Sequence, residues 1–214
     1  MVDDYRNTIY CPKYSDISGK KKMLVEKIRL CHPHARDMHA IIHPNDSIYK
    51  DDFMKIYNHK CSYCGVSVEV ITRTNFEIDH FIYQKSERFA TKADAGDIEN
   101  LVLACHDCNR DKSSFEFPDD KYNDFYPDGD EIRRTFIRDD DYYIKIADEK
   151  NGDAIINEFY EKLRLGSEIH RIDYLLMNMM ELQEEIQDKP EACSQLGQAI
   201  KKLHTKRNVI KRNA

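Results

Sequence analysis

The sequence predicts an α+β fold, in which a small mixed core follows a helical segment and precedes a C-terminal helical region. Three observations predict it. A stretch rich in β-branched and aromatic residues, 66–83, lies between two Cys-x-x-Cys pairs. Residues 153–212 contain no strand-like run, and their apolar residues recur at spacings of three and four. The length of 214 residues suits one domain, or a small domain with a helical extension.

Composition limits the classes of function. Hydrophobic residues make up 41% of the chain, which is enough for a core. The net charge of −6 argues against a tight, autonomous nucleic-acid binder, because such affinity comes largely from neutralising phosphates, but it allows an enzyme with a local basic cleft. No apolar run approaches ~18 residues, and the N-terminus lacks the order of a signal peptide. We therefore expect a cytoplasmic protein without a membrane span.

We assign residues 1–50 to an N-terminal segment that is partly helical. Apolar residues at helical spacing predict a helix over about 20–31. Four histidines follow, interrupted by Pro33 and Pro44, and their spacing matches no metal site. We favour a short helix between the prolines, with histidines that face solvent or cap neighbours, over a second metal site, and leave their roles open. The four are His32, His34, His39 and His43.

We assign residues 51–118 to the core. Ser47 can cap a short helix that leads into the first cysteine pair. Residues 66–83 are expected to form strands, and residues 86–97 a polar loop. Residues 97–114 indicate a short helix or turn, then the second cysteine pair, then the first turn of another helix.

We assign residues 119–152 to an acidic loop and a short strand. Over 119–141 nine acidic residues face four basic ones, a composition typical of a solvated loop that would repel DNA. The run "YYIKI" predicts one strand, and Asn151-Gly152 predicts a turn after it.

We assign residues 153–214 to a C-terminal helical region of two or three helices. Pro190 suits the first position of a helix. Residues 199–214 are basic and contain no acidic residue. These cations could contact DNA or simply favour a helix C-terminus, and we prefer the second interpretation because they are spread around the helix.

The cysteines predict a structural zinc site. Cys61, Cys64, Cys105 and Cys108 form two Cys-x-x-Cys pairs, and four thiolates suit a tetrahedral Zn²⁺ with no open position for a catalytic water. A redox pair would need a βαβ pattern that is missing here, whereas an iron–sulfur cluster is not excluded by the spacing. The three remaining cysteines are interpreted as ordinary buried or partly buried thiols. They are Cys11, Cys31 and Cys193.

Between the pairs lie residues that suit a reactive site. Asp79-His80 ends the predicted strand "FEIDH", and Asn109 directly follows Cys108. Zinc would tie the start of the hairpin to the start of the next helix, and so would hold His80 against Asn109. Glu77 lies two residues before Asp79 on a strand and would face the same side, which gives it a weaker case for a role.

These segments, "CSYCG…EIDHF…ENLVLACHDCNRDK", resemble the HNH endonucleases of the His-Me finger, or ββα-metal, class. The resemblance covers about 53–115 and implies a β-hairpin and helix around one catalytic metal. It implies that His80 is the general base, that Asp79 and Asn109 hold the divalent ion, and that Asn100 holds the loop that orients His80. Many members have histidine where this chain has Asn109, so it would be an HNN variant.

The chemistry agrees with that implication. An oriented imidazole can deprotonate water near neutral pH, and a hard cation on oxygen ligands stabilises the charge that develops on a phosphodiester. Oxygen ligands from Asp79 and Asn109 favour Mg²⁺ or Mn²⁺ over Zn²⁺. Arg110 and Lys112 could contact the phosphate, with solvent exposure in the first turn of a helix as the alternative.

A looser pattern, around Leu163, Leu165 and Arg171, resembles the HNH subunits of bacterial anti-phage defence systems of the Septu or retron-associated type. It implies a protein partner, such as an ATPase, bound through the C-terminal helices. The sequence therefore predicts a metal-dependent DNA endonuclease in a defence or restriction assembly. The alternative is a non-catalytic zinc-knuckle protein that binds nucleic acid or a partner. The preferred strand type, DNA or RNA, and the oligomeric state are left open.

Overall fold

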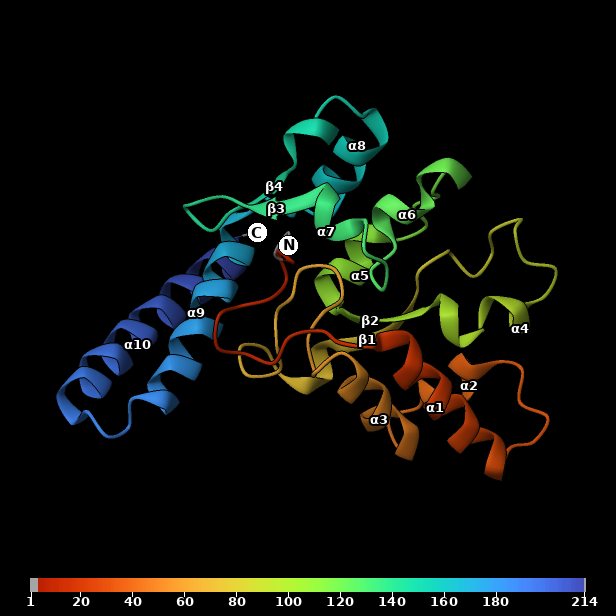
Figure 1. Cartoon of the computed structure of the whole chain (residues 1–214), viewed down its shortest axis with the longest axis horizontal. Coiled ribbons are helices and arrows are strands. Elements are labelled where there is room, and N and C mark those ends of the chain that lie inside the picture. The colour runs from red at the N-terminus through yellow and green to blue at the C-terminus, as the bar shows by residue number, and fades with distance from the viewer. Residues whose placement is uncertain (1–3, 214) are drawn as a thin grey trace.

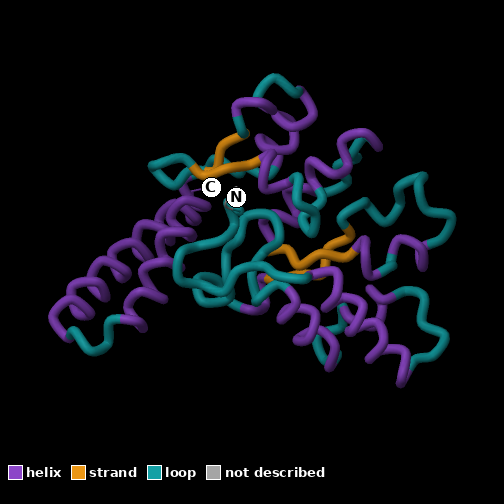
Figure 2. The backbone as a smooth tube through the Cα atoms, in the orientation of Figure 1, coloured by secondary structure: helices purple, strands orange, loops and turns teal. Residues whose placement is uncertain are grey.

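Two small antiparallel sheets and a series of helices make up residues 4–213, the part of the chain that this computed structural model describes. Figure 2 shows the two sheets at separate places, with helices and loops around them. In chain order the helices and strands are α1 Ile17–Cys31, α2 Met38–Ile42, α3 Ile48–Ile56, β1 Phe76–His80, α4 Lys92–Ala95, β2 Leu101–Cys105, α5 His106–Lys112, α6 Tyr122–Phe125, α7 Ile132–Thr135, β3 Phe136–Arg138, β4 Ile144–Ile146, α8 Ala154–Lys162, α9 Glu168–Glu185 and α10 Pro190–Asn213.

The N-terminal helices α1, α2 and α3 lie together at one end of the molecule (Figure 1). The predicted helix over about 20–31 is confirmed as α1, which starts earlier because the Asp16 side chain accepts a hydrogen bond from the Gly19 amide. The short helix expected between the prolines is α2, capped by Asp37. Ser47 caps α3, as expected. Each of these starts thus follows from a local side-chain acceptor.

The central hairpin and the helix after it form a ββα unit. Strands β1 and β2 are antiparallel, with Phe76 opposite Cys105 and His80 opposite Leu101. Helix α5 follows β2 without a loop and packs against both strands. The predicted α+β class is confirmed, and this unit is its mixed core.

The short helix or turn expected at the start of residues 97–114 is the 3₁₀ helix Ile98–Asn100, but strand β2 follows it where no strand was predicted. All five residues of "LVLAC" are buried, and a short continuous apolar run has no periodicity that separates a buried strand from a buried helix. Residues 66–83 were expected to form strands throughout, but β1 is the one strand in this range. Val68, Val70 and Ile71 pack against the core from a loop, so their burial needs no sheet ladder.

The segment expected to be an acidic loop is folded. It contains α6, α7 and β3, and β3 pairs with the predicted strand β4. Its apolar residues Phe125, Ile132 and Phe136 are fully buried. Phe125 and Phe136 both contact Phe159 of α8, with ring centroids 4.9 and 6.0 Å away. The sparse apolar residues therefore build core even though acidic residues dominate the composition.

The C-terminal region consists of α8, α9 and α10, and α10 begins at Pro190 as expected. Helices α9 and α10 pack side by side and project from the rest of the molecule (Figure 1). A buried ion pair joins them, with Arg207 Nε 2.5 Å from Asp173 Oδ1, and Lys206 pairs with Glu168. Lys211 pairs with Asp107 near the second cysteine pair. Part of the basic tail is thus neutralised within the protein.

No helix in residues 4–213 is long and apolar enough to cross a membrane.

Candidate active site and metal centre

The two cysteine pairs meet at one point. Their side chains are all buried, and the four sulfurs lie within 4.8 Å of one another. A turn closes the first pair, since the Gly65 amide donates to the Cys61 carbonyl over 2.9 Å. Gly65 has φ of 83°, and a Cβ there would overlap the Arg6 backbone, so glycine is required. The four thiolates fit one tetrahedral ion of the zinc type, as the sequence predicts. They are Cys61, Cys64, Cys105 and Cys108.

The first cysteine pair is fastened to the hairpin. The Ser62 amide donates to the Leu103 carbonyl of β2 over 2.7 Å. Tyr63, also within the pair, donates its hydroxyl to Asp79 Oδ2 over 2.8 Å. Along β2, Cys105 and the position opposite His80 are about 13 Å apart, at ~3.3 Å per residue. The cysteine cluster is therefore remote from His80, but it fixes Asp79 through Tyr63.

A cavity of about 400 Å³ lies along β1, from Glu77 to His80, and is lined by α5 as well. It brings together three of the sequence-predicted catalytic residues, from β1 and from α5. The lining residues are His39, His43, Glu77, Ile78, Asp79, His80, Tyr83, Gln84, Asn109 and Ser113.

Asp79 lies at the bottom of this opening, 6% exposed. Its Oδ2 accepts the Tyr63 hydroxyl and lies 3.3 Å from Lys112 Nζ. Its Oδ1 accepts no hydrogen bond from residues 4–213. Burial raises the pKa of Asp79 to about 6, although Lys112 and Tyr63 act to lower it. One carboxylate oxygen is thus held and the other is left for a ligand.

His80 is half-buried, and its ring faces the same opening. Its backbone carbonyl accepts Lys112 Nζ over 2.9 Å, whereas neither ring nitrogen has a hydrogen-bond partner within the described chain. Burial, together with the neighbouring His39, lowers the pKa of His80 to about 4. The imidazole is therefore neutral at neutral pH and can accept a proton.

Asn100 lies just before β2 and outside the opening. It is buried, its Oδ1 accepts the Ile82 amide over 2.8 Å, and its Nδ2 donates to the carbonyls of Ile82 and Ala95 over 3.0 and 2.8 Å. Asn100 therefore joins the segment after His80 to the end of α4. This geometry suits a residue that holds a loop.

Asn109 and Glu77 contact each other across the opening. Asn109 donates to Glu77 Oε2, and His106 Nδ1 lies 2.9 Å from Glu77 Oε1. Burial acts to raise the pKa of Glu77, but the hydrogen bonds of His106 and Asn109 outweigh it, and the pKa is lowered. The side-chain oxygen of Asn109 has no partner among residues 4–213. Glu77 thus does face the same side as Asp79.

Residues 61–115 match the family model described as HNH endonuclease. The match is confined to this segment, less than half of the chain, and we call residues 61–115 the HNH domain. The match spans both cysteine pairs, the hairpin and α5. No curated protein and no solved structure has a significant match to the chain.

Two basic residues of the HNH domain do not lie at the cavity as phosphate contacts would. Lys112 is 1% exposed and holds Asp79 and the backbone of His80, so it is neither a surface phosphate contact nor a solvated cation. Arg110 is exposed on α5 and does not line the opening. The sequence pattern could not separate these two neighbours, because a seven-residue helix turns one inward and the other outward.

Two histidines from outside the HNH domain complete the wall of the opening. His39 and His43 are four residues apart, a spacing that places them on one face of α2. In the sequence, this spacing is the signal that would place the two side chains together. His32 and His34 are exposed and do not line it.

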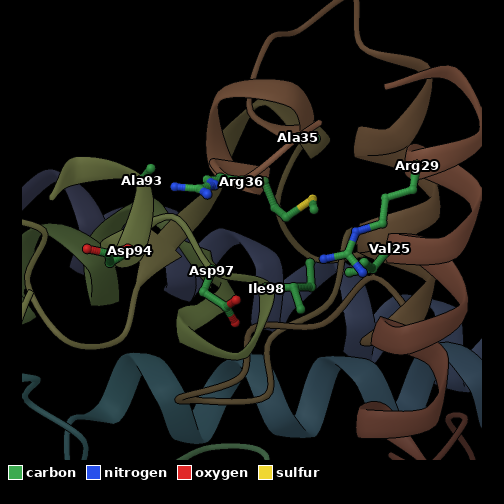
Figure 3. A pocket seen from close by; sticks show the side chains of 9 residues that line it. Val25, Arg29, Ala35, Arg36, Ala93, Asp94, Asp97 and Ile98 are labelled. Carbon is green, nitrogen blue, oxygen red and sulfur yellow. The ribbon is translucent and has the colours of Figure 1, made fainter. Parts of the chain in front are cut away.

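A second hollow, of about 360 Å³, lies elsewhere around α2 (Figure 3). Arg29 and Arg36 reach it from α1 and the turn before α2, and Asp94 and Asp97 reach it from α4 and the turn that follows. Its charges are mixed, since two arginines and two aspartates line it, and its wall contains no histidine or cysteine, so it offers no imidazole and no soft metal ligand.

The remaining cysteines are free thiols. Cys11 is buried and Cys193 is half-buried, as expected. Cys31 is exposed, which corrects the expectation of a buried or partly buried side chain. It is the last residue of α1, where the helical apolar face has already left the core.

Proposed function

We propose that the protein is a metal-dependent endonuclease that hydrolyses phosphodiester bonds in DNA. The observation that carries this proposal is the convergence of Asp79, His80 and Asn109 on one opening between β1 and α5. The HNH match supports a nuclease in general. The neutral imidazole and the oxygen donors beside it supply the chemical groups that phosphodiester hydrolysis needs.

His80 is the proposed general base. It takes a proton from a water in the opening while the water oxygen forms a bond to phosphorus and the bond from phosphorus to the leaving sugar oxygen breaks. A base must be unprotonated to act, and the low pKa of His80 keeps it so at neutral pH. Asn100 would keep the loop after His80 in place without touching substrate.

Asp79 Oδ1 and the side-chain oxygen of Asn109 would hold the catalytic divalent ion. Hard oxygen donors of this kind favour Mg²⁺ or Mn²⁺. Such an ion supplies charge stabilisation to the phosphoryl oxygens and the leaving oxygen. Tyr63 and Lys112 hold the opposite oxygen of Asp79, and so orient the carboxylate toward the opening.

The cysteine cluster is the proposed zinc site, with a structural role. Its four buried thiolates leave no position for a water, and it lies at the far end of the hairpin from His80. We also propose a reducing compartment, the cytoplasm, because thiolates that ligate a metal persist where disulfides do not form.

The competing function is a zinc-knuckle protein that binds nucleic acid or a partner without catalysis. A plasmid-nicking assay with Mg²⁺ or Mn²⁺ separates the two. Wild type should cleave, and His80→Ala should not, while both contain the same amount of zinc. Cleavage by neither protein, on duplex, single-stranded and RNA substrates, would favour the binding module. Equal cleavage by both would remove His80 from the mechanism.

The biological setting is proposed to be an anti-phage defence or restriction assembly, with an ATPase or another protein bound to the C-terminal helices. One end of the α9–α10 pair contacts the HNH domain through Lys211 and Asp107, whereas the end with the connecting turn projects outward, which supports an external contact there (Figure 1). The acidic net charge supports a partner that supplies grip on DNA. Plating phage on cells that carry the gene with and without its neighbours tests this; equal plaque counts throughout would contradict it.

A further inference from the structure

His39 of α2 stacks on His80. The two ring centroids are 4.2 Å apart and the ring planes are inclined by 35°. His39 lies outside residues 61–115, so this contact comes from a part of the chain that the HNH match does not include. It covers one face of the imidazole that is proposed to act as the base.

His39 is itself fixed to the strand that carries His80. Its Nε2 lies 3.3 Å from the Ile78 carbonyl of β1, an arrangement in which Nε2–H donates to that carbonyl. The ring of His43 also packs against the ring of His39, with centroids 4.8 Å apart. Thus β1 and α2 both restrict the His39 ring.

The backbone of α2 is also fixed at this point. The amides of Met38 and His39 donate to the Gly96 carbonyl over 2.9 and 3.3 Å. A Cβ at residue 96 would overlap the Asp37 carboxylate that caps α2, so the close approach requires glycine. Asn100 holds the neighbouring Ala95 carbonyl. A continuous set of hydrogen bonds therefore runs from Asn100 to the helix that carries His39.

The need for such a contact follows from the hydrogen bonding of His80. A general base is usually oriented by a hydrogen bond to its second ring nitrogen. Within residues 4–213 no side chain or carbonyl provides one to His80. Instead of such a hydrogen bond, the contact with the His39 ring restricts rotation of the His80 imidazole. Its orientation matters, because a displacement near 1 Å at a reacting group can cost about 10²-fold in rate.

From this geometry we propose that His39 is a positioning residue for His80: by stacking on its ring, it holds the base in the orientation that removes the proton from water. The inference rests on the proposed nuclease function. It assigns His39 no contact with substrate or metal. Its effect is exerted on the rate of the chemical step and is transmitted only through the His80 ring.

The test measures single-turnover cleavage with saturating Mg²⁺ or Mn²⁺. His39→Leu removes the aromatic ring, and its rate should fall at least tenfold, with KM changed less than twofold. His39→Phe keeps a flat ring and should recover to within about threefold of wild type. His34→Leu is the matched control, an exposed histidine of the same segment, and should cleave like wild type. Zinc content and Tm are measured for each variant to exclude misfolding.

A double-mutant comparison separates positioning from a general structural role. In the His80→Ala background, His39→Leu should cause no further loss of the residual rate, because the group through which it acts is absent. A further tenfold loss there would overturn the inference, as would wild-type cleavage by His39→Leu in the otherwise native chain; both leave the nuclease function standing. A wild type that cleaves no substrate overturns the proposed function and this inference together.

Discussion

Lys112 and Asp79 form an ion pair inside the protein, with Lys112 Nζ 3.3 Å from Asp79 Oδ2 and both side chains less than 8% exposed. The same ammonium donates to the carbonyls of His80 and Phe81 over 2.9 and 3.1 Å. Helix α5 is thereby joined to the end of β1 at the two residues that are proposed to act. Lys112 thus links the strand β1 and the helix α5 of the HNH domain.

Lys112→Met should destabilise the protein, because it leaves the Asp79 carboxylate buried without its partner. Breaking one side of a buried pair costs roughly 3–5 kcal/mol in the free energy of unfolding. Urea unfolding of the variant and of wild type measures the difference. Arg110→Met is the control, since Arg110 is exposed on the same helix, and its effect should stay within about 0.5 kcal/mol. Equal stabilities for the two variants would contradict the proposed link.

Zinc should be present at one ion per chain and should be needed for the folded HNH domain. Cys105→Ser removes one of the four sulfurs and should lose zinc, lower the Tm and abolish protection of the hairpin amides, since metal binding contributes folding free energy directly. Metal analysis and thermal unfolding check this. Cys31→Ser changes an exposed thiol remote from the cluster and should keep zinc and Tm. Zinc retained by Cys105→Ser would exclude that sulfur as a ligand.

Local chemistry explains which parts of this fold could be predicted from sequence. The cysteine spacing, the cap at Ser47, the helix start at Pro190 and the placement of His80 and Asn109 at one cavity all follow from short-range patterns or from one metal constraint. Strand β2 could not be predicted, because its burial on both sides removes the alternation that marks a strand.

Long-range contacts explain what was missed at the site. Whether Lys112 faces solvent or Asp79 depends on how α5 packs on β1. No local sequence pattern predicts that packing. The stacking of His39 on His80 joins residues from α2 and β1, and it depends on the Gly96 carbonyl that holds α2. Such partners become visible only when the tertiary arrangement is known.

Asn109→His should retain nuclease activity and alter the choice of metal. Imidazole nitrogen suits Ni²⁺, Zn²⁺ and related ions better than the amide oxygen does, whereas Mg²⁺ prefers oxygen. We expect the ratio of Ni²⁺-supported to Mg²⁺-supported cleavage to rise at least tenfold. Asn109→Ala provides no ligand and should lose about 10²-fold with every ion. Activity of Asn109→Ala equal to wild type would exclude the side chain from the catalytic centre.

His170 should make the protein less stable as the pH falls. It is buried in α9, its Nδ1 has no hydrogen-bond partner within residues 4–213, and burial lowers its pKa despite the attraction of Asp173. The folded state therefore keeps His170 neutral, while the unfolded chain binds a proton below about pH 6.5. Above that pH, His170 has no effect on the free energy of unfolding. Below it, the free energy of unfolding falls by up to ~1.4 kcal/mol per pH unit until the folded pKa is reached.

Urea unfolding at pH 7.5 and pH 5.5 measures this dependence. Wild type should lose more stability than His170→Leu between the two pH values, by up to ~1.4 kcal/mol. Acid effects on the thiolates and on the other histidines are common to both proteins, so they cancel in the difference. His34→Leu, an exposed change, should keep the wild-type dependence. If His170→Leu and wild type lose stability equally, the buried imidazole is already charged, or satisfied by a water, in the folded protein at neutral pH.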